Sequence, residues 1–246
     1  MSRPDIAADA RRAVDAVKAG GVVVFPTDVG YAGTGGCEAA LTRFFRAKGR
    51  GAHKRNAMLG TPELRRDVHI PDARADEMIR CLVEDYDLPV SAIGPFRPDH
   101  PLLRKLGDTA LSASTEGGTL AILMNVGPLE HAMATLAANE GQPLFGSSAN
   151  LTGTGTKFRG ADVQAEIKAA AELVIDYGLM KYYRYRRSST MIDFRTMEVV
   201  RIGACYELIS EVLERWFGVD LPADPGLEAL PSGHLREAQR AYGLTG

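Results

Sequence analysis

Short apolar runs alternate with segments of helical periodicity, and this alternation constrains the fold of the chain more than any other feature. Residues 21–25 form an apolar run that leads directly into Pro26 and Thr27, and residues 119–126 form another. Residues 5–19, in contrast, place their apolar side chains near one face of a helix and end at two glycines. Strands that alternate with helices predict an α/β domain whose largely parallel sheet is covered by helices.

The same pattern predicts the remaining elements. Further helices are expected over residues 38–48, 62–66, 129–138, 163–171 and 207–217. Further strands are expected over residues 56–59, 143–145, 173–176, 189–194 and 198–202. The glycine-rich stretch 33–36 is interpreted as a flexible turn. We expect residues 1–210 to form one domain, and residues 211–246 to form a C-terminal helix and a tail packed on its surface.

The composition narrows the class of protein. The 246 residues are 45% hydrophobic and 24% charged, as expected for a soluble globular chain with one large core. The net charge of −2 means that any anion site must be a local patch. The 3 cysteines and 5 histidines lack the spacing of a disulfide framework or a protein-built metal site. Since no run suits a membrane span and the N-terminus lacks an apolar signal core, we expect a cytoplasmic protein without membrane contact.

The stretch 145–153 is the strongest candidate for a ligand-binding loop. Three hydroxyls, one amide and two glycines crowd into it, from Ser147, Ser148, Thr152, Asn150, Gly146 and Gly153. Hydroxyls, an amide and exposed backbone N–H groups can all bind one anion without carrying a net charge. This loop and the loop at Thr27 both follow strands, where ligands bind in sheets of this kind.

Lys48, Gly49 and Arg50 supply the cations that this loop lacks. An arginine can bind a phosphate through two parallel hydrogen bonds, whereas a lysine acts as a point charge. Both can reach one triphosphate only where the helix has ended and the chain turns, which Gly49 permits. The alternative interpretation is that these residues only stabilise the dipole at a helix C-terminus. Together the two segments indicate a phosphate-binding pocket assembled from distant parts of the chain.

Five motifs that occur in order carry a resemblance to a known family. They are Gly21-Val22-Val23-Val24-Phe25-Pro26-Thr27 followed by Tyr31, Ala47-Lys48-Gly49-Arg50, Ser147-Ser148-Ala149-Asn150-Leu151-Thr152-Gly153, Ser189-Thr190-Met191-Ile192-Asp193 and Val200-Arg201-Ile202-Gly203-Ala204. Over residues 8–210 the chain resembles a divergent member of the YrdC/Sua5/YciO family, whose signatures read PTETVYGL, KGRP, TSANxSG, STVVD and VLRxG.

The resemblance implies a single domain with a twisted, open, mostly parallel sheet and a concave, basic cleft. It also implies a nucleotidyltransferase that makes L-threonylcarbamoyladenylate from threonine, bicarbonate and ATP and releases pyrophosphate. The product would serve the N6-threonylcarbamoylation of an adenosine in tRNA. Magnesium is expected to arrive with ATP, because no carboxylate cluster in the sequence demands it.

The resemblance also implies roles for particular residues. The positions that match the family's nucleotide-binding residues are Lys48, Arg50, Ser148, Asn150, Ser189 and Arg201. Thr27 and Tyr31 match the loop beside the amino-acid substrate. No residue is assigned as a general acid or base.

Several positions depart from the family signatures. Val29 replaces the second threonine of the Pro-Thr loop, and Ala32 replaces the glycine after the tyrosine. Leu123 stands where a strand of the family carries an arginine. Losing a cation from an anion pocket costs roughly 1.5–3 kcal/mol of charge-assisted contact. Arg55 or the cations of residues 181–187 are candidates to replace it.

Two function classes therefore stay open. The first is a carbamoyladenylate-forming enzyme that acts on threonine or another small amine. The second is a related module that binds double-stranded RNA, tRNA or a nucleotide without catalysis. Residues 181–187 interleave tyrosines with cations, as single-stranded nucleic-acid surfaces do, although a solvated loop that closes over the cleft explains the same composition. The intact nucleotide motifs favour the enzyme, whereas Val29 and Leu123 favour a divergent enzyme or the binding module.

Overall fold

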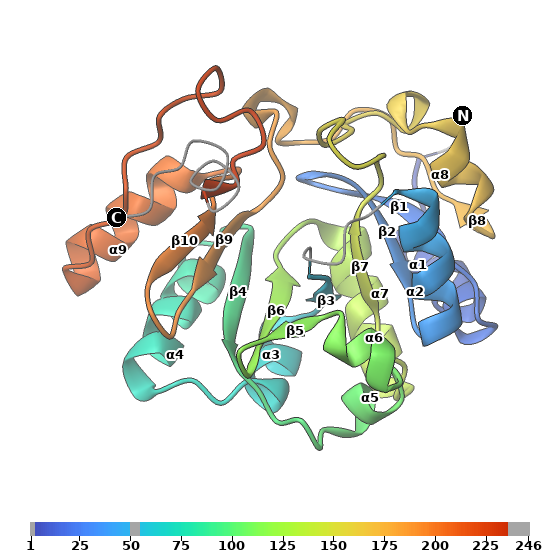
Figure 1. Ribbon diagram of the computed structural model, residues 1–246, viewed down its shortest axis with the longest axis horizontal. Coiled ribbons are helices and arrows are strands. Elements are labelled where there is room, and N and C mark those ends of the chain that lie inside the picture. The colour runs from blue at the N-terminus through green and yellow to red at the C-terminus, as the bar shows by residue number, and fades with distance from the viewer. Residues whose placement is uncertain (1–2, 50–54, 236–246) are drawn as a thin grey trace.

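The computed structural model describes residues 3–49 and 55–235, which build one large sheet flanked by helices (Figure 1). Within these residues the strand order is β10-β9-β4-β6-β3-β7-β2-β1-β8, with β5 paired to β6. The strands are β1 (Val23–Thr27), β2 (Gly30–Gly35), β3 (Ala57–Leu59), β4 (Val90–Pro95), β5 (Thr115–Glu116), β6 (Thr119–Met124), β7 (Phe145–Ser148), β8 (Leu173–Val174), β9 (Thr190–Asp193) and β10 (Glu198–Arg201).

The helices vary from one turn to more than three turns. They are α1 (Ile6–Lys18), α2 (Glu38–Ala47), α3 (Pro62–Val68), α4 (Ala73–Arg80), α5 (Pro101–Arg104), α6 (Asp108–Ser112), α7 (Pro128–Asn139), α8 (Ala165–Ala169) and α9 (Tyr206–Phe217). Short segments of other helical types are η1 (Cys81–Asp85), η2 (Gly160–Asp162) and η3 (Tyr183–Tyr185). No helix among the described residues is long and apolar enough to cross a membrane.

The sheet is mixed, and not mostly parallel as the alternation of strands and helices predicts. Of the nine strand pairings between described residues, six are antiparallel and three are parallel. Only Asp28 and Val29 join β1 to β2, and only Gly117 and Gly118 join β5 to β6. A two-residue connection can join only antiparallel neighbours, because a parallel pair needs a longer crossover. The α/β fold with a helix-flanked sheet is confirmed, whereas its strands are mostly antiparallel.

Strand β2 occupies the place of the flexible turn predicted for residues 33–36. It is buried along its whole length and lies between β1 and β7. A Cβ on Gly33 would lie 2.2 Å from the Phe44 ring, and a Cβ on Gly146 would lie 2.1 Å from the Gly33 carbonyl oxygen. The glycines therefore allow close packing of β2 against β7 and α2, and the prediction of a flexible turn is wrong.

Most other elements lie where the sequence predicts them. Helix α1 begins after Asp5, whose carboxylate accepts the N–H of Ala8 at 3.0 Å. Helix α9 spans Tyr206–Phe217, so residue 210, the predicted limit of the domain, lies inside this helix. Strand β4 and the short helices α4, α5 and α6 have no counterpart among the expected elements.

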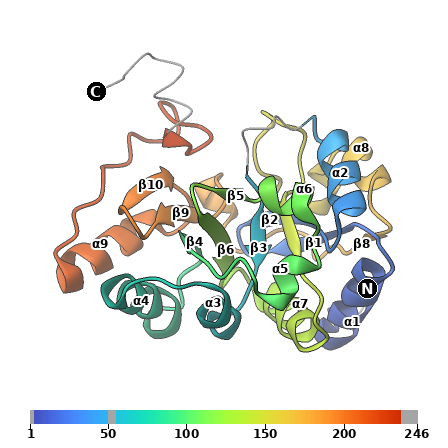
Figure 2. The ribbon, with the colours of Figure 1, turned by 60° about the horizontal axis from the view of Figure 1, so that its bottom comes forward.

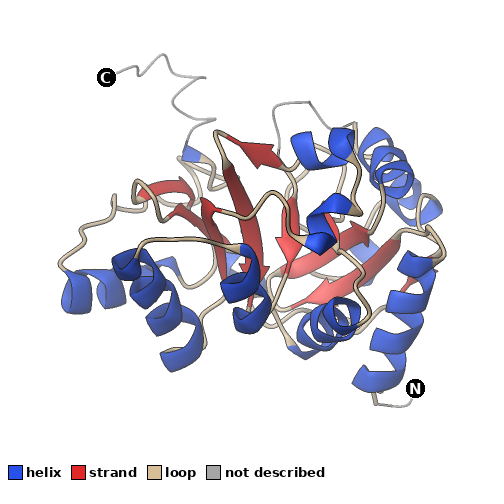
Figure 3. Cartoon of the chain, turned by 90° about the horizontal axis from the view of Figure 1, so that it is seen from below, coloured by secondary structure: helices blue, strands red, loops and turns tan. Residues whose placement is uncertain are grey.

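Helices cover one face of the sheet along its whole width, whereas the other face is covered only at one end. Helices α9, α4, α3, α7 and α1 lie in a row along the covered face (Figure 2). Helices α2, α6 and α8 gather on the opposite face, over one end of the sheet (Figure 2 and Figure 3). Met58, Ile122 and Ala92, from the central strands, belong to the main core together with Leu64 of α3 and Ile209 of α9. Alternate side chains of the same strands are left for the open face.

Candidate functional site

The open face of the central strands forms the floor of a cavity of about 960 Å³. This volume lies at the upper end of the range for small-molecule sites. The floor consists of alternate residues of three neighbouring strands, namely Ala57, Leu59, Ala121, Leu123, Ser91 and Ile93. Because side chains along a strand alternate between its two faces, the residues between them serve the core instead.

Small side chains in the middle of this floor leave the space open. Ala57 is paired with Ala121 of β6 on one side and with Gly146 of β7 on the other. Larger apolar side chains, Leu59, Leu123, Ile93 and Met191, line the cavity around them.

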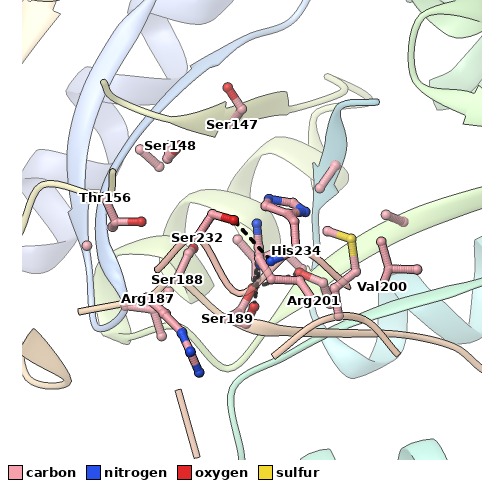
Figure 4. A pocket seen from close by; sticks show the side chains of 18 of the residues that line it. Ser147, Ser148, Thr156, Arg187, Ser188, Ser189, Val200, Arg201, Ser232 and His234 are labelled. Carbon is pink, nitrogen blue, oxygen red and sulfur yellow. Dashed lines mark hydrogen bonds between the residues drawn. The ribbon is translucent and has the colours of Figure 1, made fainter. Parts of the chain in front are cut away.

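The polar residues of the site gather at two ends of the cavity. Figure 4 shows Ser147 and Ser148 at one end, and Ser189, Arg201, Ser232 and His234 grouped at the other.

The first end is held together by Lys48. Ser147 and Ser148 lie within strand β7, so the loop predicted here begins only at Ala149. The Lys48 ammonium group, 3% exposed, donates to the carbonyl oxygen of Ser148 and, at 2.8 Å, to that of Asn150. The Lys48 carbonyl in turn accepts the N–H of Thr152 at 2.9 Å. Lys48 therefore fastens the C-terminus of α2 to the serine–asparagine segment, beyond any role as a helix cap.

Among the described residues, two buried polar atoms at this end have no hydrogen-bond partner. The Asn150 side chain, 7% exposed, donates from Nδ2 to the Leu151 carbonyl at 2.6 Å, while its Oδ1 makes no hydrogen bond. The hydroxyl of Ser147 is likewise buried and unpartnered. Both residues line the cavity. Since buried polar groups are nearly always hydrogen-bonded, these two atoms on the cavity are candidate ligand-binding groups.

Thr27 and Tyr31 line the cavity beside this end, but their hydroxyls bind other parts of the fold. Thr27 Oγ1 donates to the Gly30 carbonyl at 2.5 Å, across the turn between β1 and β2. The Tyr31 hydroxyl bonds to the carboxylate of Asp176 and accepts the N–H of Tyr177 at 3.1 Å. Burial, followed by the bond to Asp176, raises the pKa of Tyr31 above its usual value. The Tyr31 hydroxyl therefore stays protonated and is directed to the segment after β8.

The second end is built around Ser189, which precedes β9 and is fully buried. Its hydroxyl lies 2.8 Å from the hydroxyl of Ser91. Arg201, the last residue of β10, donates from Nε to the Ser189 carbonyl at 2.8 Å and from Nη2 to its hydroxyl at 2.9 Å. The structure thus brings Ser189 and Arg201 together, and it places both on the cavity that Lys48, Ser148 and Asn150 also line.

Charged side chains around the cavity are mostly cationic. Among the described lining residues the cations are Lys48, Arg55, Arg186, Arg187, Arg195 and Arg201, and the acids are Glu116, Asp193 and Glu228. Arg55 lies 3.9 Å from Glu116, and Arg195 lies 3.4 Å from Asp193. Arg50 lies outside the described residues. In the part of the chain that the structure describes, no group of three or more His, Cys, Asp or Glu side chains could hold a metal ion.

Residues 218–235, called the wall segment below, were expected as part of a surface tail, yet they reach the cavity. Leu227, Glu228, Pro231, Ser232 and His234 line it. Leu221 and Leu230 of the same segment are buried in the main core. Sequence reasoning missed this placement because the segment is rich in proline and glycine. Leu221 and Leu230 are apolar residues in this stretch, and their apolar character is the local signal for burial.

Comparisons with known proteins agree with this geometry. A family model for Sua5, YciO and YrdC, described as telomere recombination, matches residues 15–203. The hypothetical protein smu.1377c of Streptococcus mutans has a similar structure, with a TM-score of 0.71 and 23% identity over 85% of this chain and 92% of that one. E. coli YciO gives a TM-score of 0.63 and 21% identity over 82% and 92% of the two chains. No curated protein sequence matches significantly.

A structure of P. abyssi Sua5 complexed with L-threonine is also similar, with a TM-score of 0.69 and 21% identity. The match covers 86% of this chain but only 59% of that Sua5 chain. At these identities the structural likeness establishes the fold. The family model, in contrast, spans most of the chain and includes Lys48, Ser148 and Asn150 at one end of the cavity and Ser189 and Arg201 at the other. The chain therefore belongs to the Sua5/YciO/YrdC family.

Proposed function

We propose that this protein is a nucleotidyltransferase that forms a carbamoyl adenylate from ATP, bicarbonate and a small amino acid, with threonine as the first candidate. The observation that carries the proposal is the pair of unpartnered atoms on the cavity, Asn150 Oδ1 and Ser147 Oγ. Asn150 Oδ1 can only accept, whereas a hydroxyl can donate or accept, so the pair suits a ligand with both kinds of group. The similarity to a Sua5 protein with bound L-threonine supports an amino acid as one substrate.

The proposed reaction needs positioning more than covalent catalysis. The amine of the amino acid combines with bicarbonate to give a carbamate and water. A carbamate oxygen then attacks the α-phosphorus of ATP, and the bond from that phosphorus to the bridging oxygen breaks, so that pyrophosphate leaves. Negative charge on the phosphate oxygens is stabilised by preorganised donors and cations, of which Lys48 and Arg201 are already held in place by the fold.

Other residues support this assignment by their position. Ser148 and Ser189 lie at opposite ends of the cavity, so a nucleotide and an amino acid can share the space between them. Arg50 is proposed to contribute a further cation to the triphosphate. Magnesium is expected to arrive with ATP and to neutralise part of its charge. The product would serve threonylcarbamoylation of tRNA in the cytoplasm.

Pyrophosphate release tests this proposal directly. The protein is incubated with ATP and magnesium, with and without bicarbonate, and with one amino acid at a time. We expect release that depends on bicarbonate and on a small amino acid, and that falls sharply in the Asn150→Ala variant. If no amino acid supports release from a correctly folded protein, the synthase proposal is rejected.

A second candidate function is RNA binding without synthesis, which one surface favours. Lys181, Tyr183 and Arg184 are exposed next to each other, and the Arg184 guanidinium lies 5.6 Å from the centre of the Tyr183 ring. Arg187 of this stretch is buried, so about three cations, Lys181, Arg184 and Arg186, can engage a phosphate backbone, and the slope of log affinity against log salt is then about −2 to −3. A gel-shift titration with tRNA and duplex RNA at several salt concentrations measures this slope. No shift, or a flat salt dependence, rejects the RNA-binding function.

A further inference from the structure

The wall segment lies beyond the part of the chain that matches the family model, which ends at residue 203. It is nevertheless tied to the domain at several points. Leu221 and Leu230 are buried, and the Tyr206 hydroxyl donates to the carbonyl of Pro222 at 2.5 Å. A segment with these anchors has one fixed course over the cavity, unlike a solvated tail.

Arg187 makes the largest set of contacts to this segment. Its side chain is 3% exposed, although it is one of the cations that line the cavity. Nε and Nη2 donate to the carbonyl of Leu230 at 3.1 and 2.6 Å, Nη2 donates to that of Gly226 at 2.9 Å, and Nη1 donates to the carboxylate of Asp224 at 2.7 Å. All three nitrogens of this guanidinium therefore bind the wall segment.

Gly233 forms a second attachment, next to Arg201. The N–H of Ile202 donates to the Gly233 carbonyl at 2.9 Å, and His234 pairs with Arg201 in an antiparallel bridge. Gly233 has a φ of +75°, and a Cβ there would lie 2.0 Å from the Ile202 carbonyl oxygen. Only glycine fits this contact without moving one of the two backbones. The attachment places Ser232 and His234 beside Ser189 and Arg201 (Figure 4).

We propose that the wall segment is part of the ligand-binding site, with Ser232 and His234 contacting the nucleotide, and that Arg187 is a positioning residue that acts through this segment. The identity of the ligand rests on the proposed function. The charge of Arg187 holds three groups of the wall segment in place, and its effect on ligands is indirect.

Calorimetric titration of ATP tests the proposal with the full chain. We expect Arg187→Ala and Gly233→Ala each to weaken ATP binding about tenfold or more, and the double variant to be no weaker than the weaker single variant, since both act through one element. His234→Ala and Ser232→Ala, which leave the anchors in place, are expected to weaken ATP binding several-fold. Threonine binding is expected to stay unchanged in all four. Arg215→Ala, which removes the same charge from the exposed face of α9, serves as the control.

Hydrogen exchange separates this inference from the proposed function, because it needs no ligand. In Arg187→Ala, or in the milder Asp224→Asn if the first folds poorly, the amide of Ile202 is expected to lose protection at least tenfold. Unchanged protection would overturn the positioning role. Additive losses of ATP affinity in the double variant would show instead that Arg187 contacts the ligand directly. If the wild-type protein binds ATP and the His234→Ala and Ser232→Ala variants bind it with the same affinity, the wall segment is not part of the ligand-binding site.

Discussion

The two ends of the cavity are built in similar ways but are completed differently. At one end the Lys48 ammonium binds the carbonyls of Ser148 and Asn150, and at the other the Arg201 guanidinium binds the backbone and hydroxyl of Ser189. In both, a cation fixes a polar segment before any ligand arrives. Within the described part of the chain, the Lys48 end leaves Asn150 Oδ1 and Ser147 Oγ without partners, whereas the Ser189 hydroxyl bonds to Ser91 and Arg201. We therefore expect a ligand to complete the hydrogen bonds of the first end, whereas those of the second end are already formed within the protein.

The largest effect is expected from Lys48→Met. The change leaves two buried carbonyls without their charged donor, at about 1–3 kcal/mol each, so the free energy of unfolding should fall by about 2–6 kcal/mol. ATP affinity should fall at least tenfold, because the serine–asparagine segment loses its anchor. Chemical denaturation and calorimetry measure the two quantities. Lys18→Met, at an exposed ion pair on α1, is the control, and unchanged ATP affinity in Lys48→Met would remove this end from the nucleotide site.

Asn150→Ala separates binding from stability. The variant loses the bond to Leu151 but also removes an unpartnered buried oxygen, so the free energy of unfolding should change by no more than about 1 kcal/mol. Ligand affinity should nevertheless fall about tenfold. Asn56 offers a matched control, since it too is buried with an unpartnered Oδ1 but does not line the cavity. Equal losses of ligand affinity in Asn56→Ala and Asn150→Ala would show that the loss does not come from a contact between Asn150 and the ligand.

At the second end, Ser189→Ala should lower stability more than it lowers ATP affinity. It removes the bonds to Ser91 and Arg201, so the free energy of unfolding should fall by about 1–3 kcal/mol, while ATP affinity falls less than about threefold. Thermal denaturation of Ser189→Ala, Ser91→Ala and the double variant checks this prediction. Both single changes break the bond between the two hydroxyls, so their losses of stability should not add in the double variant. A tenfold loss of affinity without loss of stability would make this end ligand-dependent as well.

The smallest effect is expected for the selectivity between amino-acid substrates, which would bind above the cavity floor between the two ends. Leu123 and Val29 line the cavity where the family signatures place polar groups. An apolar pocket discriminates between substrates by only about 1–3 kcal/mol per methylene. A pocket that hydrogen-bonds a substrate hydroxyl, in contrast, strongly rejects a substrate that lacks this hydroxyl. Threonine and valine have nearly the same shape and differ only by a hydroxyl in place of a methyl group, so we expect their kcat/KM values to differ by no more than about a hundredfold. Strict dependence on threonine would mean that other residues compensate for Leu123 and Val29.

Local sequence patterns predicted one end of the site better than the other. Lys48, Ser148 and Asn150 fall in short motifs directly after a helix or a strand, so their meeting could be expected. Strand β2 was missed because its glycines indicate a turn, although close packing requires them. The wall segment was missed because the bond from Arg187 to Leu230 spans 43 residues without a periodic pattern. Antiparallel pairing was missed because the alternation of elements does not report the length of each connection.

The alternation of side chains along the central strands has a consequence for divergence. Ala121 and Ile93 face the cavity, while Ile122 and Ala92, their neighbours in the chain, belong to the main core. A mutation at a floor position can change which molecule fits while the neighbouring positions continue to stabilise the fold. Ligand preference and folding are thus inherited on separate faces of the same short segments. New specificities can then arise in this scaffold by single substitutions, without passing through unfolded intermediates.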